Sequence, residues 1–416
     1  MRIVLGWLFA AALLWAADAT IEVTKKVDSL PSIAVEDASV NYTGSFSKGF
    51  FRALVGDLNV LSLFNVDRHY TTTHFNNADV NPANEKFDYV LRYRLQQDDN
   101  GAFVADAKLM GHGGVIMNKR YSLKNSDQFV FIAHTMAYDV NEKMGASSVE
   151  WMKRKIILSR LVGPHKSEIL VADYTLNYQK PIIIGGLNVF PKWADRDQRS
   201  IYYTNLDGRK PTLYRMDTMT GKRQKVISSD GMMVCSDVSK DGARLLLTMA
   251  PSGQPDVYLF DTATGSSKQL TFYSGIDVNG QFMEGNRIAF VSNRMGYPNI
   301  YSKVIGGKGV EQMVYYGKSN STCSAHGEYI VYKARESSNA FSANTFNLHL
   351  ISTKSDFIRR LTATGINEFP RFSKDGDAIL FIKNYKEQSA LGVIRLAHNR
   401  NYLFPLSIGK IQSMDW

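Results

Sequence analysis

The sequence lacks the common signatures of an active site. It has no Gly-x-Ser-x-Gly elbow and no His-Glu-x-x-His motif, and its eight histidines are scattered along the chain. Gly317-Lys318-Ser319 has no glycine five residues earlier, so the phosphate-loop pattern fails. The Ser-Lys-Asp-Gly turns have neither the spacing nor the aromatic residue of a sialidase Asp-box. We therefore predict no catalytic residue, no metal and no cofactor, while a carboxylate pair assembled by the fold stays an open alternative.

Clustered charge is also missing. The formal net charge is +10, but the basic residues are spread over the whole chain, and their longest cluster is Lys153-Arg154-Lys155. We interpret this charge as a solvated surface with some attraction to anionic components of a cell envelope. Because we also predict that the chain is exported from the cytoplasm, we expect no nucleic-acid partner.

Long apolar runs are absent except at the N-terminus, where one extends from Ile3 to Trp15 with Gly6 inside it. This run is shorter than the roughly 20 residues that cross a bilayer, and Ala17-Asp18-Ala19 follows with the small-x-small pattern of a cleavage site. We predict a signal peptide over residues 1–19 and a mature chain in the periplasm without a transmembrane segment. A retained signal anchor is the alternative.

What the sequence does have is a repeat. Short β-prone runs begin at Ile156, Ile201, Leu245, Ile288, Ile330 and Ile379, and a second series, which includes Val257-Tyr-Leu-Phe260, keeps the same period. Turns such as Asp261-Thr-Ala-Thr-Gly265 and Val238-Ser-Lys-Asp-Gly242 separate further strands. Four short strands in each repeat are typical of a propeller blade, so six repeats predict a six-bladed β-propeller over residues 149–416. A linear β-solenoid or separate hairpins are the alternatives.

The C-terminus resembles the start of the later repeats. Ser413-Met-Asp-Trp416 matches Lys192-Trp193, whereas the first repeat has no such strand before it. We predict that the last residues supply the innermost strand of the first blade and close the ring. Cys235 and Cys323 then fall on different sides of the channel, which predicts two free, partly buried thiols; a disulfide between them is the alternative.

Residues 20–148 lack the repeat. Alternating and helical periodicity predict a small α/β domain, in which two helices, 46–63 and one capped by Ser126, cover one face of a mixed sheet. We place the joint to the propeller at Gly145-Ala-Ser-Ser148. Residues 20–28 are polar and form either a frayed terminus or a detachable strand that adds to the sheet of a partner.

Polar loops on one face of the propeller are the candidate binding surface. Loops between the second and third strands of a blade share a face with the connections between blades, and convergent loops at a channel mouth form a recognition surface. A merely solvated rim is the alternative. The residues that we select on this face are Asp230, Met232, Asp277, Asn279, Asn293, Arg294, Ser319, Asn320, Asn367 and Glu368.

The order of signal peptide, small α/β domain and propeller resembles the TolB family, the periplasmic component of the Tol-Pal system. The most specific stretch is Ile288-Ala-Phe-Val-Ser-Asn-Arg-Met-Gly-Tyr-Pro-Asn-Ile-Tyr301. Two features depart from the family: its Trp-Ser-Pro-Asp-Gly reads Val238-Ser-Lys-Asp-Gly here, and one junction between blades reads Asp277-Val-Asn-Gly280, where an acidic residue followed by proline is usual.

The resemblance implies a non-enzymatic scaffold of the Gram-negative envelope, and we expect a monomer. It implies that the lipoprotein Pal binds the propeller face, that other envelope proteins are further partners, and that the process is outer-membrane integrity and constriction at cell division. It also implies that the N-terminal segment binds TolA, through Thr20, Ile21, Glu22, Val23, Thr24, Lys25 and Lys26. The alternative function is a periplasmic propeller enzyme or glycan-binding protein that uses the channel mouth.

Overall fold

The computed structural model describes residues 30–416 except residues 41, 43, 337–344 and 387. Residues 31–416 form one compact unit. The predicted signal peptide and the predicted partner-binding segment 20–26 lie outside the described residues. Among the described residues, no helix is both long and apolar enough to cross a membrane.

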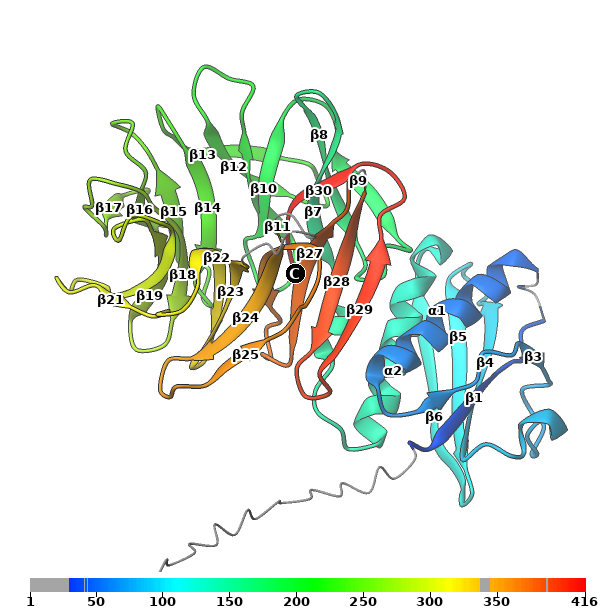
Figure 1. The fold of residues 1–416 in the computed structure, drawn as a ribbon. Coiled ribbons are helices and arrows are strands. Elements are labelled where there is room, and N and C mark those ends of the chain that lie inside the picture. The colour runs from blue at the N-terminus through cyan, green and yellow to red at the C-terminus, as the bar shows by residue number, and fades with distance from the viewer. Residues whose placement is uncertain (1–29, 41, 43, 337–344, 387) are drawn as a thin grey trace, which may run out of the picture. The chain divides into compact units, whose positions relative to one another are not determined.

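The N-terminal part contains a mixed sheet with strand order β2-β1-β4-β5-β6, and β3 also pairs with β1. Strand β1 runs parallel to β2, β3 and β4, whereas the pairs β4–β5 and β5–β6 are antiparallel. Both helices cover one face of this sheet (Figure 1). The elements are β1 (Ser32–Asp37), α1 (Ser45–Leu61), β2 (Asn65–Val66), β3 (Thr71–Thr72), β4 (Tyr89–Gln97), β5 (Phe103–Gly111), β6 (Gly114–Leu123) and α2 (Phe129–Lys143).

The helices form where their apolar faces meet the sheet. Leu54 and Leu58 of α1 and Met136 of α2 have no exposed surface, and they share one core with Leu91 and Leu109 of the sheet. This packing is the one that helical spacing predicts.

The predicted N-cap of the second helix is wrong. Helix α2 begins at Phe129 with no side-chain cap, and Ser126 instead starts a short 3₁₀ turn, Ser126–Gln128. The physical reason is that this extra turn precedes the helix, so the backbone N–H of Phe129 bonds to the carbonyl of Ser126. A serine that lies one turn before the start of α2 is therefore mistaken for its N-cap when only the sequence is considered.

The remaining strands form antiparallel sheets that follow the repeat (Figure 1). Among the described residues, four of these sheets have four strands each. In the fifth, two antiparallel groups of four strands are joined by the parallel pair Phe346–Ile366, and counting each group as a blade gives the six copies of the repeat. The first sheet is β30 (Lys410–Asp415), β7 (Ile156–Gly163), β8 (Lys166–Ala172) and β9 (Gln179–Ile183).

The other sheets follow in chain order. The second is β10 (Asn188–Trp193), β11 (Ser200–Asn205), β12 (Thr212–Asp217) and β13 (Arg223–Ser228); the third is β14 (Met233–Val238), β15 (Arg244–Met249), β16 (Asp256–Asp261) and β17 (Ser267–Gln269); the fourth is β18 (Asp277–Met283), β19 (Arg287–Ser292), β20 (Asn299–Val304) and β21 (Glu311–Gln312). The eight-stranded sheet contains β22 (Lys318–His326), β23 (Tyr329–Arg335), β24 (Phe346–Ser352), β25 (Ile358–Arg360), β26 (Ile366–Phe372), β27 (Ala378–Asn384), β28 (Ser389–Arg395) and β29 (Arg400–Pro405).

The predicted hairpin turns form as their chemistry requires. The Asp261 carboxylate accepts hydrogen bonds from the backbone N–H groups of Ala263 and Thr264, at 3.0 and 2.8 Å. Gly265 then takes a φ of 71°, which a residue without a Cβ adopts at little cost. Asp217 and Gly221 repeat the arrangement between β12 and β13.

The C-terminal strand β30 pairs with β7, at the position where the first repeat lacks a strand of its own. Ser413 lies opposite Ser159 and Asp415 lies opposite Ile157. The Asp415 carboxylate also accepts a bond from the Lys192 ammonium at 2.9 Å, which ties β30 to the next sheet. The two ends of the repeat are thus joined by backbone and side-chain bonds.

A buried charge network joins the N-terminal helices to the first propeller sheet. His134 of α2 lies between two carboxylates, with Nδ1 at 2.8 Å from Asp57 of α1 and Nε2 at 3.2 Å from Asp173, just after β8. Tyr174 also donates its hydroxyl to Asp57. All four residues are fully buried. Burial would lower the pKa of His134, but the charges and hydrogen bonds of the two carboxyl groups outweigh it and raise that pKa to about 9, so the imidazole is protonated at neutral pH and donates from both ring nitrogens.

Candidate binding face and the channel beneath it

Backbone hydrogen bonds bring the two predicted sets of loops together. The N–H of Leu206 bonds to the carbonyl of Leu187, and the N–H of Ala250 bonds to that of Met232. In each pair, one residue follows the second strand of a sheet and the other lies in or beside the preceding connection. We call this surface the loop face. It consists of the loops between second and third strands, residues 206–211, 250–255, 293–298, 385–386 and 388, and of the connections between sheets, residues 184–187, 229–232, 270–276, 313–317, 361–365 and 406–409.

The selected residues differ in their exposure. Asp230 is exposed and lies 2.5 Å from the Lys210 ammonium, and 46% of the surface of Met232 is accessible. Glu368 is half-buried between Lys333 and Asn384, at 2.9 and 2.8 Å. The remaining half-buried members of the set are Asn279, Asn293, Arg294 and Ser319.

Asp277, Asn320 and Asn367 have no exposed surface. The Asp277 carboxylate accepts two bonds from the Arg294 guanidinium, at 3.0 and 3.2 Å. The side-chain amide of Asn320 bonds to Asn299, and that of Asn367 bonds to Asn347, both at 3.1 Å. Asp277 thus holds the β19–β20 loop of its own sheet, whereas Asn320 ties β22 to β20 of the preceding sheet and Asn367 ties β26 to β24. All three support the loop face from below.

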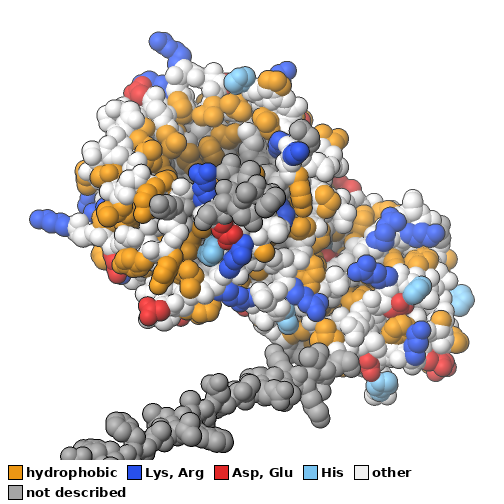
Figure 2. Space-filling view, viewed as in Figure 1, with side chains coloured by type: hydrophobic (Ala, Val, Ile, Leu, Met, Phe, Trp, Pro, Cys, Tyr) orange, Lys and Arg blue, Asp and Glu red, His pale blue; other side chains and the backbone are white. Residues whose placement is uncertain are grey.

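Exposed hydrophobic side chains on the same loops were missed by the sequence reasoning, which considered mainly polar loop residues. Phe272, Tyr315 and Tyr316 expose 75%, 74% and 72% of their surfaces, and Met295 exposes 64%. Figure 2 shows hydrophobic side chains gathered over the propeller. The available signal was the pairs Phe272-Tyr273 and Tyr315-Tyr316, two adjacent aromatic residues in segments expected to be loops. Contiguous exposed apolar surface marks interaction sites.

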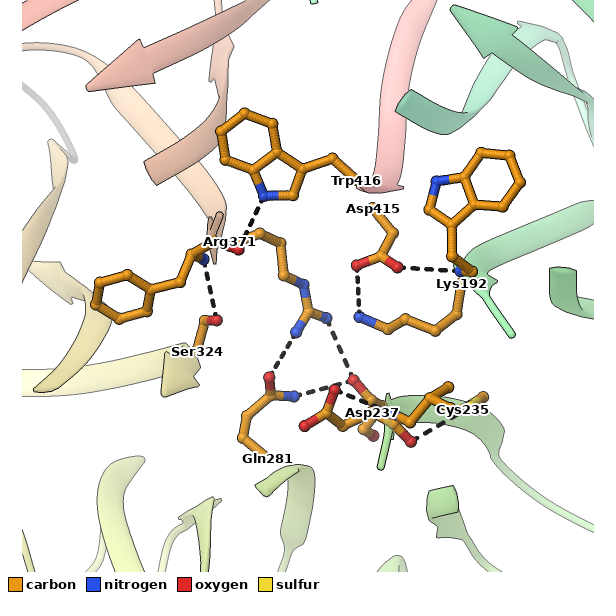
Figure 3. A network of polar contacts seen from close by, with 12 residues as sticks. Lys192, Cys235, Asp237, Gln281, Ser324, Arg371, Asp415 and Trp416 are labelled. Carbon is orange, nitrogen blue, oxygen red and sulfur yellow. Dashed lines mark hydrogen bonds and ion pairs between the residues drawn. The ribbon is translucent and has the colours of Figure 1, made fainter. Parts of the chain in front are cut away.

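Beneath the loops, side chains of the innermost strands β10, β14, β18, β22, β26 and β30 meet in a network of polar contacts (Figure 3). Arg371 donates to the Gln281 side chain at 2.7 Å, and Gln281 donates in turn to the backbone of Ser236 at 3.0 Å. Asp237 accepts a bond from the backbone N–H of Phe282 at 2.8 Å. Burial raises the pKa of Asp237, and the charges of Lys192 and Arg371 act against that rise. The network ties strands of different sheets to one another.

The two cysteines are free and buried, more deeply than the sequence suggested, with exposed fractions of 2% for Cys235 and 1% for Cys323. Burial raises the pKa of each thiol to about 12, so neither carries a thiolate at neutral pH. In the part of the chain that the structure describes, no three His, Cys, Asp or Glu side chains come together as metal ligands.

Comparison with known proteins identifies the family. Residues 160–416 match the model of the TolB beta propeller domain. Proteins named Tol-Pal system protein TolB are similar over both full lengths: that of Wolinella succinogenes is 48% identical and that of Campylobacter jejuni 44%, each with 100% of both chains covered. The crystal structure of TolB from Acinetobacter baumannii is similar with a TM-score of 0.75 and 19% sequence identity, and the match covers 93% of this chain and 97% of the Acinetobacter chain. The chain therefore belongs to the TolB family of Tol-Pal system proteins.

Proposed function

We propose that this protein is a non-enzymatic periplasmic scaffold of the Tol-Pal system that holds Pal on its loop face. The observation that supports this most is the exposed aromatic surface of Phe272, Tyr315 and Tyr316. Aromatic side chains of this kind dominate the binding energy of protein interfaces, while the charged rim adds orientation. In this proposal, Asp230, Met232 and Glu368 belong to the contact surface. Asp277, Asn320 and Asn367 support it without touching the partner.

We propose further that the N-terminal segment, residues 20–28, binds TolA. Its alternating Ile21-Glu22-Val23-Thr24 can extend as a strand along the open edge of a partner sheet. A scaffold with two separate contacts would couple the two partners for outer-membrane integrity and constriction at division. We also propose that the signal peptide ends at residue 19, that the N-terminal domain ends at residue 148 and that the propeller begins at residue 149.

The Pal contact predicts a clear effect of aromatic truncation. Replacing both Tyr315 and Tyr316 with alanine should weaken the binding of purified Pal at least tenfold, because buried interface aromatics commonly contribute more than about 1 kcal/mol each. Titration of the mature protein with Pal, followed by calorimetry, measures this. Ala263→Glu is the matched control, since Ala263 is exposed in the turn between β16 and β17, outside the loop face. Unchanged Pal affinity in the tyrosine variant would contradict the proposed surface.

Charge reversal separates contact residues from supporting ones. Asp230→Lys, at an exposed position, should lower Pal affinity with no change in thermal stability. Asp277→Lys is unsuitable for this purpose, because it leaves the guanidinium of Arg294 beside a second positive charge and destabilises the fold instead.

The proposed TolA contact predicts that some substitutions remove TolA binding and leave Pal binding intact. Replacing Ile21 and Val23 with aspartate should abolish capture of TolA and leave Pal affinity unchanged, because the two contacts use different parts of the chain. The measurement is a pull-down of purified TolA and Pal with the same variant. Loss of both partners, or retention of TolA, would refute the assignment to this segment.

A further inference from the structure

A groove lies where the N-terminal domain meets the first two propeller sheets, away from the loop face. Its lining includes Phe131 of α2, Tyr178 beside β9 and Trp193 at the end of β10, and its cavity volume is about 170 Å³. A cavity of about 150 Å³ holds a benzene molecule. The groove therefore has room for one large apolar side chain between aromatic rings, of which Phe131 and Tyr178 already meet edge to face at 5.5 Å.

The charged groups that line the groove are both positive, and its other polar groups are neutral. Lys155 and Lys180 line it, both are exposed, and neither ammonium has an ion-pair partner among the described residues. Within the described part of the chain, no acidic side chain lines the groove. Burial raises the pKa of Tyr178, and the negative charge of Asp127 adds to this rise. Asp127 therefore lies near the groove, but it is not part of the lining.

Trp193 supplies the second, independent observation. Its side chain is only 6% exposed, and its indole N–H has no acceptor among the described residues. An indole N–H can only donate, and buried polar groups in folded proteins nearly always have a partner. A ligand that brings an oxygen acceptor into the groove would satisfy this group.

The turn between β12 and β13 adds an adaptable apolar contact. Met219 lines the groove from this turn and exposes 84% of its surface. A flexible thioether at the edge of a pocket can repack around different side chains. The groove thus combines an aromatic floor, an adaptable apolar edge and two ammonium groups.

We propose that this groove binds an acidic segment of a partner protein. One large apolar side chain of the segment inserts between Phe131, Tyr178 and Trp193, and flanking carboxylates face Lys155 and Lys180. A carboxylate or backbone carbonyl of the segment accepts the bond from the Trp193 indole. This site is separate from the loop face, so it would add a contact that the proposed Pal and TolA interactions do not use.

The test uses the full mature protein and a fluorescein-labelled peptide, Gly-Glu-Leu-Glu-Phe-Glu-Gly, with fluorescence anisotropy at low salt. We expect saturable binding that weakens with salt, because the ion pairs are at the surface. The same peptide with glutamine in place of glutamate should bind at least tenfold more weakly. Equal binding of the two peptides, or no binding of the acidic one, would overturn the proposal.

Matched variants locate the binding. The double variant K155E/K180E should weaken the acidic peptide at least tenfold, whereas the control K225E/K268E, on two exposed outer strands, should not change it. Trp193→Phe keeps a ring but removes the N–H, and we expect a loss of about threefold to tenfold. Thermal melting of each variant confirms that it is folded. Unchanged affinity in K155E/K180E would overturn the proposal. Glu22 is an acidic residue of the chain's own N-terminal segment. If Glu22→Lys bound the acidic peptide more tightly, that segment would be the natural occupant of the groove, and the assignment to a partner would be overturned.

Discussion

Deleting residues 412–416 should lower the melting temperature by more than 10 °C or leave no folded protein. The deletion removes most of β30 and exposes the edge of β7, to which it pairs. It also leaves the Lys192 ammonium, 5% exposed, without the Asp415 carboxylate. Breaking a buried ion pair costs about 3–5 kcal/mol, against a total stability of about 5–15 kcal/mol for a typical domain. Differential scanning calorimetry of the mature chain with and without these residues measures the change.

A second pair of variants keeps this prediction testable if the truncated chain does not fold. Asp415→Leu alone leaves the buried Lys192 ammonium without its carboxylate partner, so it should strongly destabilise the folded protein. Adding Lys192→Met removes that charge, and the double variant should recover part of the lost stability, because an apolar pair often replaces a buried ion pair without net cost. The recovery is incomplete because the backbone N–H of Trp193, which donates to Asp415 at 3.0 Å, stays without its acceptor. A truncated chain that melts within 2 °C of the intact protein would refute the role of β30 in closing the ring.

Replacing His134 with glutamine should destabilise the protein by about 3–5 kcal/mol at pH 6, because it leaves two buried carboxylates without their cation. Burial by itself would lower the pKa of His134, but the charges and hydrogen bonds of Asp57 and Asp173 outweigh burial and raise that pKa to about 9. Urea unfolding at a series of pH values measures both the loss and its pH dependence.

The sign of the pH dependence follows from the raised pKa. The unfolded histidine loses its proton near pH 6.5, whereas the folded one keeps it to about pH 9. The contribution of His134 is therefore complete below pH 6.5 and declines by about 1.4 kcal/mol per pH unit between pH 6.5 and 9. At the acid end, the two carboxyl groups differ: burial raises the pKa of Asp57, whereas the hydrogen bond and charge contact with His134 outweigh burial and lower the pKa of Asp173. The acid-side loss of stability therefore comes from Asp173. Its contribution is thus present above the ordinary aspartate pKa and is lost as the pH falls below that value.

The variant and a control decide whether this histidine is the cause. The His134→Gln protein should lack the decline in stability between pH 6.5 and 9. His69→Gln, at a side chain with 88% exposure, should keep it. An unchanged decline in the His134 variant would show that another group titrates in this range.

Much of the fold is determined by local sequence. The repeat marks each blade because short runs of β-prone residues recur at a fixed spacing. Asp261-Thr-Ala-Thr-Gly265 makes its turn with its own side chain and a glycine at positive φ. Helical periodicity identifies α1 and α2, since an apolar face every 3.6 residues must be buried. The likeness of residues 413–416 to the start of later repeats is enough to predict where the last strand pairs.

The candidate site depends on contacts between distant residues, and these the sequence does not reveal. Asp277 and Asp230 are both acidic residues near the connections between blades, yet Asp277 is buried against Arg294 and Asp230 faces solvent. His134 is one of eight scattered histidines, and only the packing of α2 against the first blade places it between Asp57 and Asp173. The physical reason is that local chemistry fixes strands, turns and helices, while burial and charge pairing are set by which elements the closed ring and its neighbouring domain bring together.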